Sequence, residues 1–183
     1  MTNGTHRTEK VNRLTELFGR HTMVYFTGIN GSGKTQLAAL VASRFPDCWW
    51  LDLRTYNDSQ EKCALLIDAF LSHITGLTVE HNRRAWWQRV MAALPANALL
   101  VFNDLPRLEE GSVLYKVVDD LLRQAAQYGI RMLGTSNFRP PDVLLHTQPH
   151  NAIVQFDDLV FSDEEIRSQQ LMNQLFPTAS TNM

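Results

Sequence analysis

The chain has 183 residues, a formal net charge of −2 and 44% hydrophobic residues, values typical of one soluble globular domain. This charge balance gives no indication of a surface that coats nucleic acid or an anionic membrane. No apolar run reaches the roughly 18 residues of a membrane-spanning helix, and the polar N-terminus lacks the apolar stretch of a secretory signal. Cys48 and Cys63 match no zinc-binding pattern. We therefore expect a cytoplasmic protein without a membrane segment.

Helix and strand patterns alternate along the chain. In chain order, we expect a helix at 8–20, a strand at 23–27, a helix at 34–45, a strand at 48–53, helices at 59–74 and 83–94, a strand at 98–102, a helix at 113–128, a strand at 130–135, a loop with Pro140 and Pro141, a strand at 152–156 and a helix at 162–176. This alternation predicts an α/β fold, a three-layer α/β/α domain with a mainly parallel central sheet. The expected domain spans 8–177, between flexible tails at 1–7 and 178–183.

The segment 28–35, GINGSGKT, has the pattern of a phosphate-binding loop: Gly, four residues, Gly-Lys, then Thr. Its three glycines permit positive φ angles, so successive N–H groups can converge on one anion. Lys34 would neutralise the β- and γ-phosphates, and Thr35 would offer a hydroxyl ligand to Mg²⁺. The loop follows a strand and opens a helix, whose positive N-terminal end also favours phosphate. The expected binding residues are Gly28, Asn30, Gly31, Ser32, Gly33, Lys34, Thr35 and Gln36.

A polar pair, Asn103-Asp104, follows the apolar run at 99–102. In P-loop ATPases one acid of such a pair holds magnesium, and a second can orient or deprotonate the attacking water. Either Asp104 takes the magnesium role, or Asn103 reaches the metal through its carbonyl oxygen while Asp104 is the catalytic base. The expected metal residues are therefore Thr35, Asn103 and Asp104. The missing acid predicts weakened metal binding or slow hydrolysis, unless the pair merely opens the turn toward Pro106.

The strand at 130–135 is followed by Ser136-Asn137. A polar side chain at this strand end can point toward the γ-phosphate and the attacking water, so Asn137 is a candidate sensor. With Lys34 and Asp104 it completes the expected catalytic set, although Asn137 could also be a simple turn residue. Arg139 could reach a phosphate in this chain or in a neighbour, but a solvated arginine is the favoured interpretation.

Two tryptophan pairs, at 49–50 and 86–87, stand out in the sequence. The first pair lies on a strand, so its side chains point to opposite faces, and we expect both to be buried under helices. The second pair is flanked by Arg83, Arg84 and Arg89. Basic residues interleaved with aromatics can bind nucleic acid, but a solvated helix face is the more common arrangement. We therefore do not expect direct contact with nucleic acid.

The chain resembles the signal-transduction ATPases with numerous domains, the STAND class that includes NB-ARC and NACHT switches. The nucleotide-binding module of maltose-regulator-type transcription activators is the most similar. The resemblance covers about residues 8–176 and rests on the blocks VYFTGINGSGKTQLAALVASRF, CWWLDLRTYND, ALLVFNDLPRL, IRMLGTSNFRPP and FDDLVFSDEEI. It implies ATP or ADP with Mg²⁺ at Lys34 and Thr35, and places Asn103-Asp104 where the family usually has two acids. Many members have arginine at the position of Asn137, whereas Thr135-Ser136-Asn137 looks more like the sensor of AAA+ ATPases.

The resemblance implies a switch that binds ATP and hydrolyses it slowly. Its nucleotide state would be read by an attached domain, by a protein partner or by copies of the same chain. Two other functions stay open: an AAA+-like motor or loader acting on protein or nucleic acid, and a nucleotide-binding scaffold with little or no hydrolysis. Family members continue into a helical lid, a winged-helix domain and sensor repeats, so we expect either an excised domain or a protein that relies on a partner.

Overall fold

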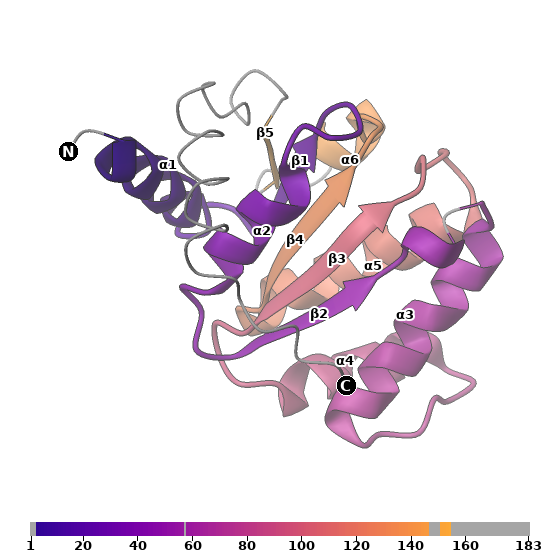
Figure 1. Ribbon diagram of the computed structural model, residues 1–183. Helices are drawn as coiled ribbons and strands as arrows, with labels where there is room; N and C mark the ends of the chain where they lie inside the picture. Colours follow the sequence, from indigo (N-terminus) through magenta and orange to yellow (C-terminus); the bar gives the residue numbers. More distant parts are fainter. Residues whose placement is uncertain (1–2, 57, 147–150, 155–183) are drawn as a thin grey trace.

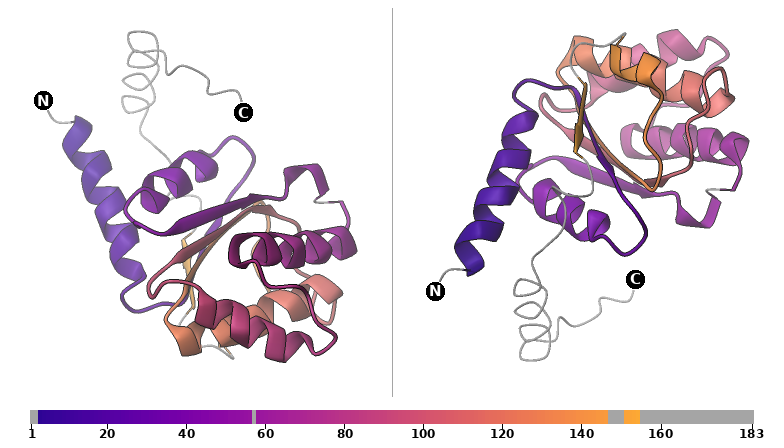
Figure 2. Two further views of the ribbon diagram at one scale, coloured as in Figure 1. Left: turned by 90° about the horizontal axis from the view of Figure 1, so that it is seen from below. Right: turned by 90° about the horizontal axis from the view of Figure 1, so that it is seen from above.

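The computed structural model describes residues 3–56, 58–146 and 151–154. Its centre is a five-stranded sheet in the order β2-β3-β4-β1-β5, in which every neighbouring pair runs parallel. Helices cover both faces of the sheet, as Figure 1 and Figure 2 show. The predicted three-layer α/β/α architecture with a parallel sheet is therefore confirmed.

The elements alternate in the order that the sequence predicts. The strands are β1 (Met23–Thr27), β2 (Cys48–Asp52), β3 (Leu99–Leu105), β4 (Arg131–Ser136) and β5 (Asn151–Val154). The helices are α1 (Asn3–Leu17), α2 (Lys34–Ala42), the short 3-10 helix η1 (Arg54–Tyr56), α3 (Gln60–Thr75), α4 (Arg83–Ala93), α5 (Val113–Tyr128) and α6 (Asp142–His146).

Most differences from the expected elements are at their ends. Helix α1 begins at Asn3, earlier than the helix expected at 8–20, so the expectation of a flexible tail at 1–7 is wrong for residues 3–7. Helix α6 occupies part of the segment expected to be a loop. Strand β3 continues through the polar pair to Leu105, past the end of the apolar run. The helix expected at 162–176 and the last residues of the strand expected at 152–156 lie outside the described residues.

Each face of the sheet has its own hydrophobic core. Helices α1 and α2 pack on one face, where Val24 and Phe26 of β1 are completely buried. Helices α3, α4 and α5 pack on the other face, against Met23 and Tyr25 of the same strand. The alternation along β1 follows from the period of two in a strand, and burial on both faces explains why its sequence is a continuous apolar run.

The start of α2 differs from the starts of the longer helices. Helices α3, α4 and α5 are preceded by the N-cap residues Ser59, Asn82 and Ser112, whose side chains each accept a hydrogen bond from a backbone N–H in the first turn. The N-cap residue of α2 is Gly33, which has no such side chain. The first N–H groups of α2 therefore have no side-chain cap and can bind an anion.

Strand β4 lies between β1 and β3, and side chains from both neighbouring strands pack over Gly134. A Cβ atom at Gly134 would lie 2.9 Å from Met23 Cε and 3.1 Å from both Leu105 Cδ1 and Tyr25 Cε2. A larger residue would therefore push against both neighbouring strands. This order means that the phosphate loop after β1 and the polar pair on β3 are separated by one strand, and that β4 connects them.

Strand β2 forms one edge of the sheet. Trp49 and Trp50 point to opposite faces as predicted, each packing against a different core. Both are only partly buried, because an edge strand has a neighbour on one side alone, so the expectation of full burial is wrong. Among the helices of the described residues, none has both the length and the apolar character needed to cross a membrane.

Candidate functional site

The phosphate loop joins β1 to α2 at the carboxyl edge of the sheet (Figure 1). Gly31 and Gly33 have φ angles of 78° and 83°, in the left-handed region that glycine adopts without a steric penalty. Gly28 is not among the described glycines with positive φ, so that part of the prediction is wrong. Its N–H instead donates to the carbonyl of Ser136 at 3.3 Å, which fastens the loop to β4.

Lys34 is buried and folds back onto the loop. Its Nζ donates to the carbonyls of Gly28 and Ile29, both at 2.8 Å, and to Ser32 Oγ at 3.3 Å. Burial lowers the pKa of Lys34, while the negative charge of Asp104 acts to raise it. The ammonium group of Lys34 is thus bound to the backbone of the loop, beside the uncapped start of α2.

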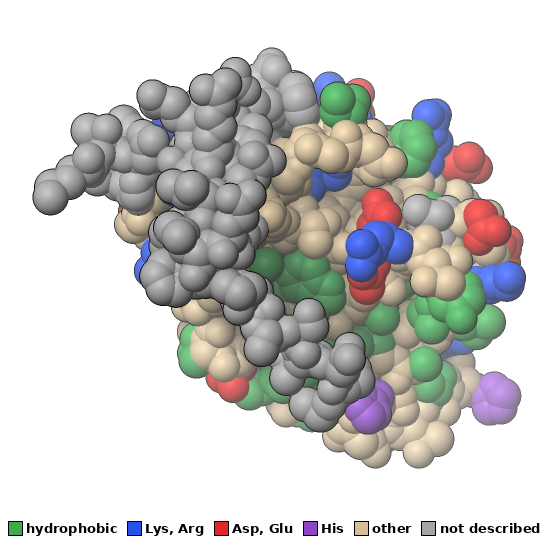
Figure 3. Space-filling model, viewed as in Figure 1, with side chains coloured by type: hydrophobic (Ala, Val, Ile, Leu, Met, Phe, Trp, Pro, Cys, Tyr) green, Lys and Arg blue, Asp and Glu red, His purple; other side chains and the backbone are tan. Residues whose placement is uncertain are grey.

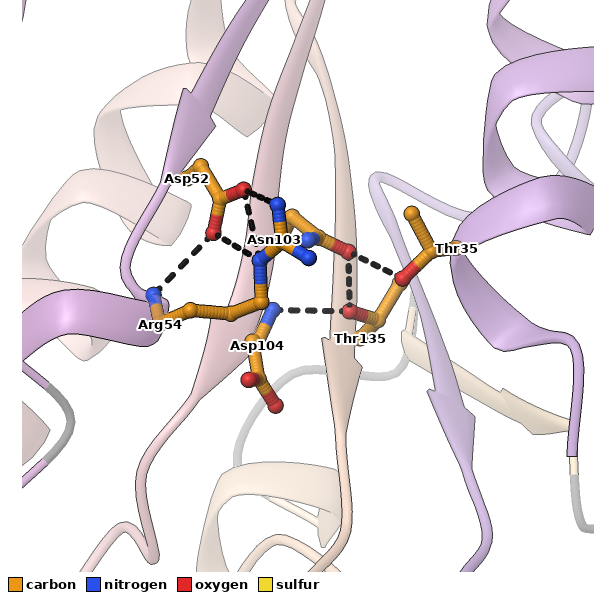
Figure 4. A network of polar contacts seen from close by, with 6 residues as sticks. All are labelled: Thr35, Asp52, Arg54, Asn103, Asp104 and Thr135. Carbon is orange, nitrogen blue, oxygen red and sulfur yellow. Dashed lines mark hydrogen bonds and ion pairs between the residues drawn. The ribbon is translucent and has the colours of Figure 1, made fainter. Parts of the chain in front are cut away.

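Three side chains from different elements meet at one amide oxygen (Figure 4). Oδ1 of Asn103 accepts hydrogen bonds from Thr35 Oγ1 at 3.0 Å and from Thr135 Oγ1 at 2.8 Å. Thr135 Oγ1 in turn accepts from the backbone N–H of Asp104 at 2.8 Å. The structure therefore brings the side chains of Thr35 and Asn103 together, and Thr135 of β4 joins them to the backbone of Asp104. The Asp104 carboxylate points away from this cluster (Figure 4).

The polar pair is itself unusual in conformation. Asn103 is completely buried, and its Nδ2 finds no hydrogen-bond partner among the described residues. Asp104 has a φ of 62°, and the register between β3 and β4 shifts between Phe102 and Leu105. A left-handed residue within a strand is sparsely populated, and aspartate is one of the residue types that tolerates it. The bulge therefore gives the two polar residues different environments.

Sequence reasoning did not assign a role to Asp52 or Arg54, yet both belong to this network (Figure 4). Asp52 is the register partner of Asn103 across β2 and β3. Its carboxylate accepts from Arg54 Nε at 2.8 Å and lies 2.6 Å from Arg54 NH2. Burial acts to raise the pKa of Asp52, but the bonds and charge of Arg54, with a contribution from the Asn103 amide, hold it below its ordinary value.

Asp52 could have been found from a weak signal, a charged residue at the carboxyl end of a strand. The missing information was the strand order, because only the pairing of β2 with β3 puts Asp52 beside Asn103. In the space-filling view, acidic and basic side chains form one compact group over the carboxyl ends of these two strands (Figure 3). This edge of the sheet therefore carries more charge than the polar pair alone supplies.

Asn137 lies at the loop, as its position after β4 predicts. Its Nδ2 donates to Asn30 Oδ1 at 3.3 Å, so the end of β4 and the phosphate loop are in direct contact. Arg139 points elsewhere: its side chain is 61% exposed, and its guanidinium pairs with Asp142 at 3.1 Å. The favoured interpretation of Arg139 as a solvated side chain agrees with this placement.

The basic and aromatic residues of α4 do not form a surface for stacking bases. Trp86 and Trp87 are buried in the core. Arg83 forms an ion pair with the buried Asp68, and Arg89 with Glu80. An apolar groove of about 380 Å³ lies between α3, α4 and α5, and it shares no residue with the phosphate loop. Neither feature belongs to the site at the carboxyl edge of the sheet.

The residues at this edge fit a magnesium-bound nucleotide. Thr35 hydroxyl, Asn103 amide oxygen and the Asp104 carboxylate are the oxygen donors that Mg²⁺ prefers, and magnesium keeps several waters of its own. No cluster of three or more His, Cys, Asp or Glu that could hold a metal by itself occurs in the described part of the chain. These three oxygen donors would need phosphate oxygens and waters to complete the coordination of a magnesium ion. Ser32 and Gln36 lie at the loop and in the first turn of α2, where the sequence places them.

Comparisons with known proteins agree with this geometry. No family model and no curated protein matches the chain. Among solved structures it is similar to a STAND protein with a tetratricopeptide repeat sensor from Pyrococcus horikoshii, with 17% identity and a TM-score of 0.50 over 92% of this chain and 25% of that chain. It is also similar to the Orc1 protein of Aeropyrum pernix in complex with DNA, with 16% identity and a TM-score of 0.62 over 93% of this chain and 49% of that chain.

A third similar structure is AMPPCP-bound DnaA from Aquifex aeolicus, with 11% identity and a TM-score of 0.56 over 94% of this chain and 51% of that chain. The chain thus spans about half the length, or less, of these three proteins. The Orc1 structure contains bound DNA. These similar structures therefore do not support the expectation that this chain makes no contact with nucleic acid. At these identities the comparisons show the fold: the chain has the fold of P-loop ATPases of the STAND and AAA+ type, as its motifs predicted.

Proposed function

We propose that this chain is an ATP-binding switch module of the STAND type, which hydrolyses ATP slowly and passes its nucleotide state to a partner or an attached domain. The observation that carries the proposal is the bond between Thr35 of the phosphate loop and Asn103 of β3. It couples the expected phosphate-binding segment to the expected metal position. The AMPPCP-bound DnaA among the similar structures supports an adenine nucleotide as the ligand.

The roles of the loop follow from its contacts. The backbone N–H groups of 31–35 and the uncapped start of α2 would bind the phosphates. Lys34, already held at the loop carbonyls, would transfer hydrogen bonds to the β- and γ-phosphate oxygens. Bound Mg²⁺, held by Thr35 and by Asn103 or Asp104, would neutralise phosphate charge.

Hydrolysis would need a water placed in line with the γ-phosphate. The water oxygen bonds to phosphorus as the bond to the β–γ bridging oxygen breaks, which releases ADP and phosphate. Asp104 would accept the proton from this water, and Asn137 would orient it from the end of β4. Asn103 offers an amide where a carboxylate is expected, so the metal site has less negative charge and turnover is expected to be slow.

Two alternatives each have one observation in their favour. The similarity to Orc1 in complex with DNA favours an AAA+-like motor or loader that acts on nucleic acid or protein. Such a motor would turn over faster when the polymer is added. The buried amide of Asn103 favours a scaffold that binds ATP without cleaving it. Single-turnover hydrolysis, with and without DNA, separates these alternatives from the slow switch.

Binding is tested by titrating ATP, ADP and GTP, each with Mg²⁺ and with a chelator, against the wild type. A saturating nucleotide at 100 times its dissociation constant should stabilise the fold by roughly 2.7 kcal/mol in thermal melting. Lys34→Ala should weaken ATP binding about 10- to 100-fold, since it removes charge-assisted hydrogen bonds. The matched control, Lys62→Ala on the exposed surface of α3, should bind as the wild type does. Equal affinity in the Lys34 and Lys62 variants would overturn the proposal.

The expected domain limits, 8–177, and self-association or a protein partner remain part of this proposal. A switch needs a second element whose contacts differ between the ATP and ADP states. Measuring the molecular mass in solution with ATP and with ADP tests whether that element is another copy of the chain. A mass that depends on the nucleotide would support it.

A further inference from the structure

The position of Asn103 raises the question of which residue supplies the missing acid. The amide oxygen of Asn103 is directed at the hydroxyls of Thr35 and Thr135, so its NH₂ group is directed the opposite way. That nitrogen is completely buried and makes no hydrogen bond of good geometry within the described residues, although the amide is close enough to the Asp52 carboxylate to help lower its pKa. A buried donor without an acceptor is unfavourable, and such groups are rare in folded proteins.

The nearest acid on the neighbouring strand is Asp52. Strands β2 and β3 pair in register from Cys48 with Leu99 to Asp52 with Asn103. The backbone N–H of Leu53 then donates to the carbonyl of Asn103 at 2.9 Å, which continues the pairing one residue further. Asp52 and Asn103 are therefore fixed side by side at the carboxyl edge of the sheet (Figure 4).

Arg54 fixes the carboxylate of Asp52 in one orientation. The backbone N–H of Arg54 donates to Asp52 Oδ1 at 3.0 Å, and its Nε donates to Oδ1 at 3.1 Å and to Oδ2 at 2.8 Å. Since η1 begins at Arg54, the chain turns immediately after β2 and keeps this side chain over the strand end. The carboxylate is thus held in place rather than free to rotate into solvent, although it is 34% exposed.

We propose that Asp52 is the positioning acid of the magnesium site: it orients the Asn103 amide and places a carboxylate, paired with Arg54, beside the position where residue 103 carries an amide. In the nucleotide-bound protein, the Asp52 carboxylate accepts a hydrogen bond from Asn103 Nδ2. This keeps Oδ1 of Asn103 directed at Thr35 and makes that oxygen a better electron donor. The inference rests on the proposed function, since it concerns the same nucleotide site.

The test removes the carboxylate from position 52 on β2 and then adds a carboxylate at position 103 on β3. For each variant, nucleotide affinity is measured over a range of Mg²⁺ concentrations, and the Mg²⁺ concentration for half-maximal affinity is compared. Asp52→Asn removes the charge and keeps the shape, so this concentration should rise roughly 10- to 100-fold, as for other residues that support metal ligands. Asn103→Asp in the Asp52→Asn background restores a carboxylate to the site, and the concentration should return close to the wild-type value.

Two controls isolate the role of Asp52. Asp47→Asn removes the same charge just before the opposite end of β2 and should leave the Mg²⁺ dependence unchanged. Asp52→Ser is a second variant, and thermal melting of both Asp52 variants without nucleotide shows that the fold is retained. If a folded Asp52→Asn protein has the wild-type Mg²⁺ dependence, this inference is wrong while the proposed function stands. If the wild type binds no nucleotide with or without Mg²⁺, it is the proposed function that fails.

Discussion

The hydroxyl of Thr135 accepts a hydrogen bond from the backbone N–H of Asp104 and donates one to the side chain of Asn103, both at 2.8 Å. One side chain on β4 therefore fixes both members of the polar pair on β3. Because Thr135 is buried, neither bond can be replaced easily by water. The Thr135 hydroxyl is therefore shared between the two residues of the polar pair.

Thr135→Val keeps the shape of the side chain and removes the hydroxyl. It leaves the Asp104 N–H without an acceptor, which should cost about 1–3 kcal/mol of the free energy of unfolding, measured by urea denaturation. Thr135→Ser keeps the hydroxyl and should cost clearly less. If the two variants unfold at the same urea concentration, the hydroxyl does not hold the polar pair.

The backbone of Asp104 predicts which substitutions the site tolerates. With φ at 62°, asparagine fits as well as aspartate, whereas valine is strained in the left-handed region. Asp104→Asn should change the free energy of unfolding by about 0.5 kcal/mol or less, and Asp104→Val should lower it by about 1–3 kcal/mol. Urea denaturation of both variants tests this. Asp104→Asn is therefore the variant with which to study the charge, because it changes the charge with little change in backbone strain.

Gly134 is expected to resist any side chain. Gly134→Ala places a methyl group against Met23, Leu105 and Tyr25, which should destabilise the fold by about 1–3 kcal/mol. Met23→Leu removes the atom that comes nearest, the terminal methyl of Met23. In that background the same alanine substitution should therefore cost less, as a double-mutant cycle of unfolding free energies would show. If the effects of the two substitutions on the free energy of unfolding simply add, contact with Met23 is not the reason that alanine at position 134 is destabilising.

The ion pair between Arg83 and Asp68 is expected to stabilise the packing of α4 on α3. Asp68 is buried, whereas the Arg83 side chain is 43% exposed, so solvent weakens the interaction. Arg83→Ala leaves a buried carboxylate without its partner and should cost about 1–3 kcal/mol in thermal or urea unfolding. Arg84→Ala, on an exposed neighbour, should stay within about 0.5 kcal/mol of the wild type. Equal effects would show that the ion pair contributes nothing specific.

Much of the fold could be predicted because its signals are local. The apolar run of β1 and the glycine that ends α5 define their elements without knowledge of the rest of the chain. Helix α6 was missed because it is a short helix after two prolines, in a segment whose composition is typical of a loop. The half-burial of Trp49 and Trp50 was missed because it depends on which strand forms the edge of the sheet.

The same difference between local signals and those that depend on strand order applies to the residues of the site. The loop from Gly28 to Thr35 is contiguous, so its sequence alone identifies it. The contribution of Thr135 and the position of Asp52 depend on the order of the strands, which no local pattern contains. The φ of Gly28 was predicted wrongly because the loop pattern does not show which of its glycines adopt the left-handed region.

The hydrogen bonds around Asn103 also have a consequence for how the protein folds. They join residues 68 and 32 positions apart in the chain, and contacts across such long loops form late because chain entropy must be lost first. A ribosome-bound chain that has emerged only as far as β3 contains the whole phosphate loop but not the bridge from β4. During refolding, nucleotide binding should therefore return with completion of the sheet, after the helices have formed.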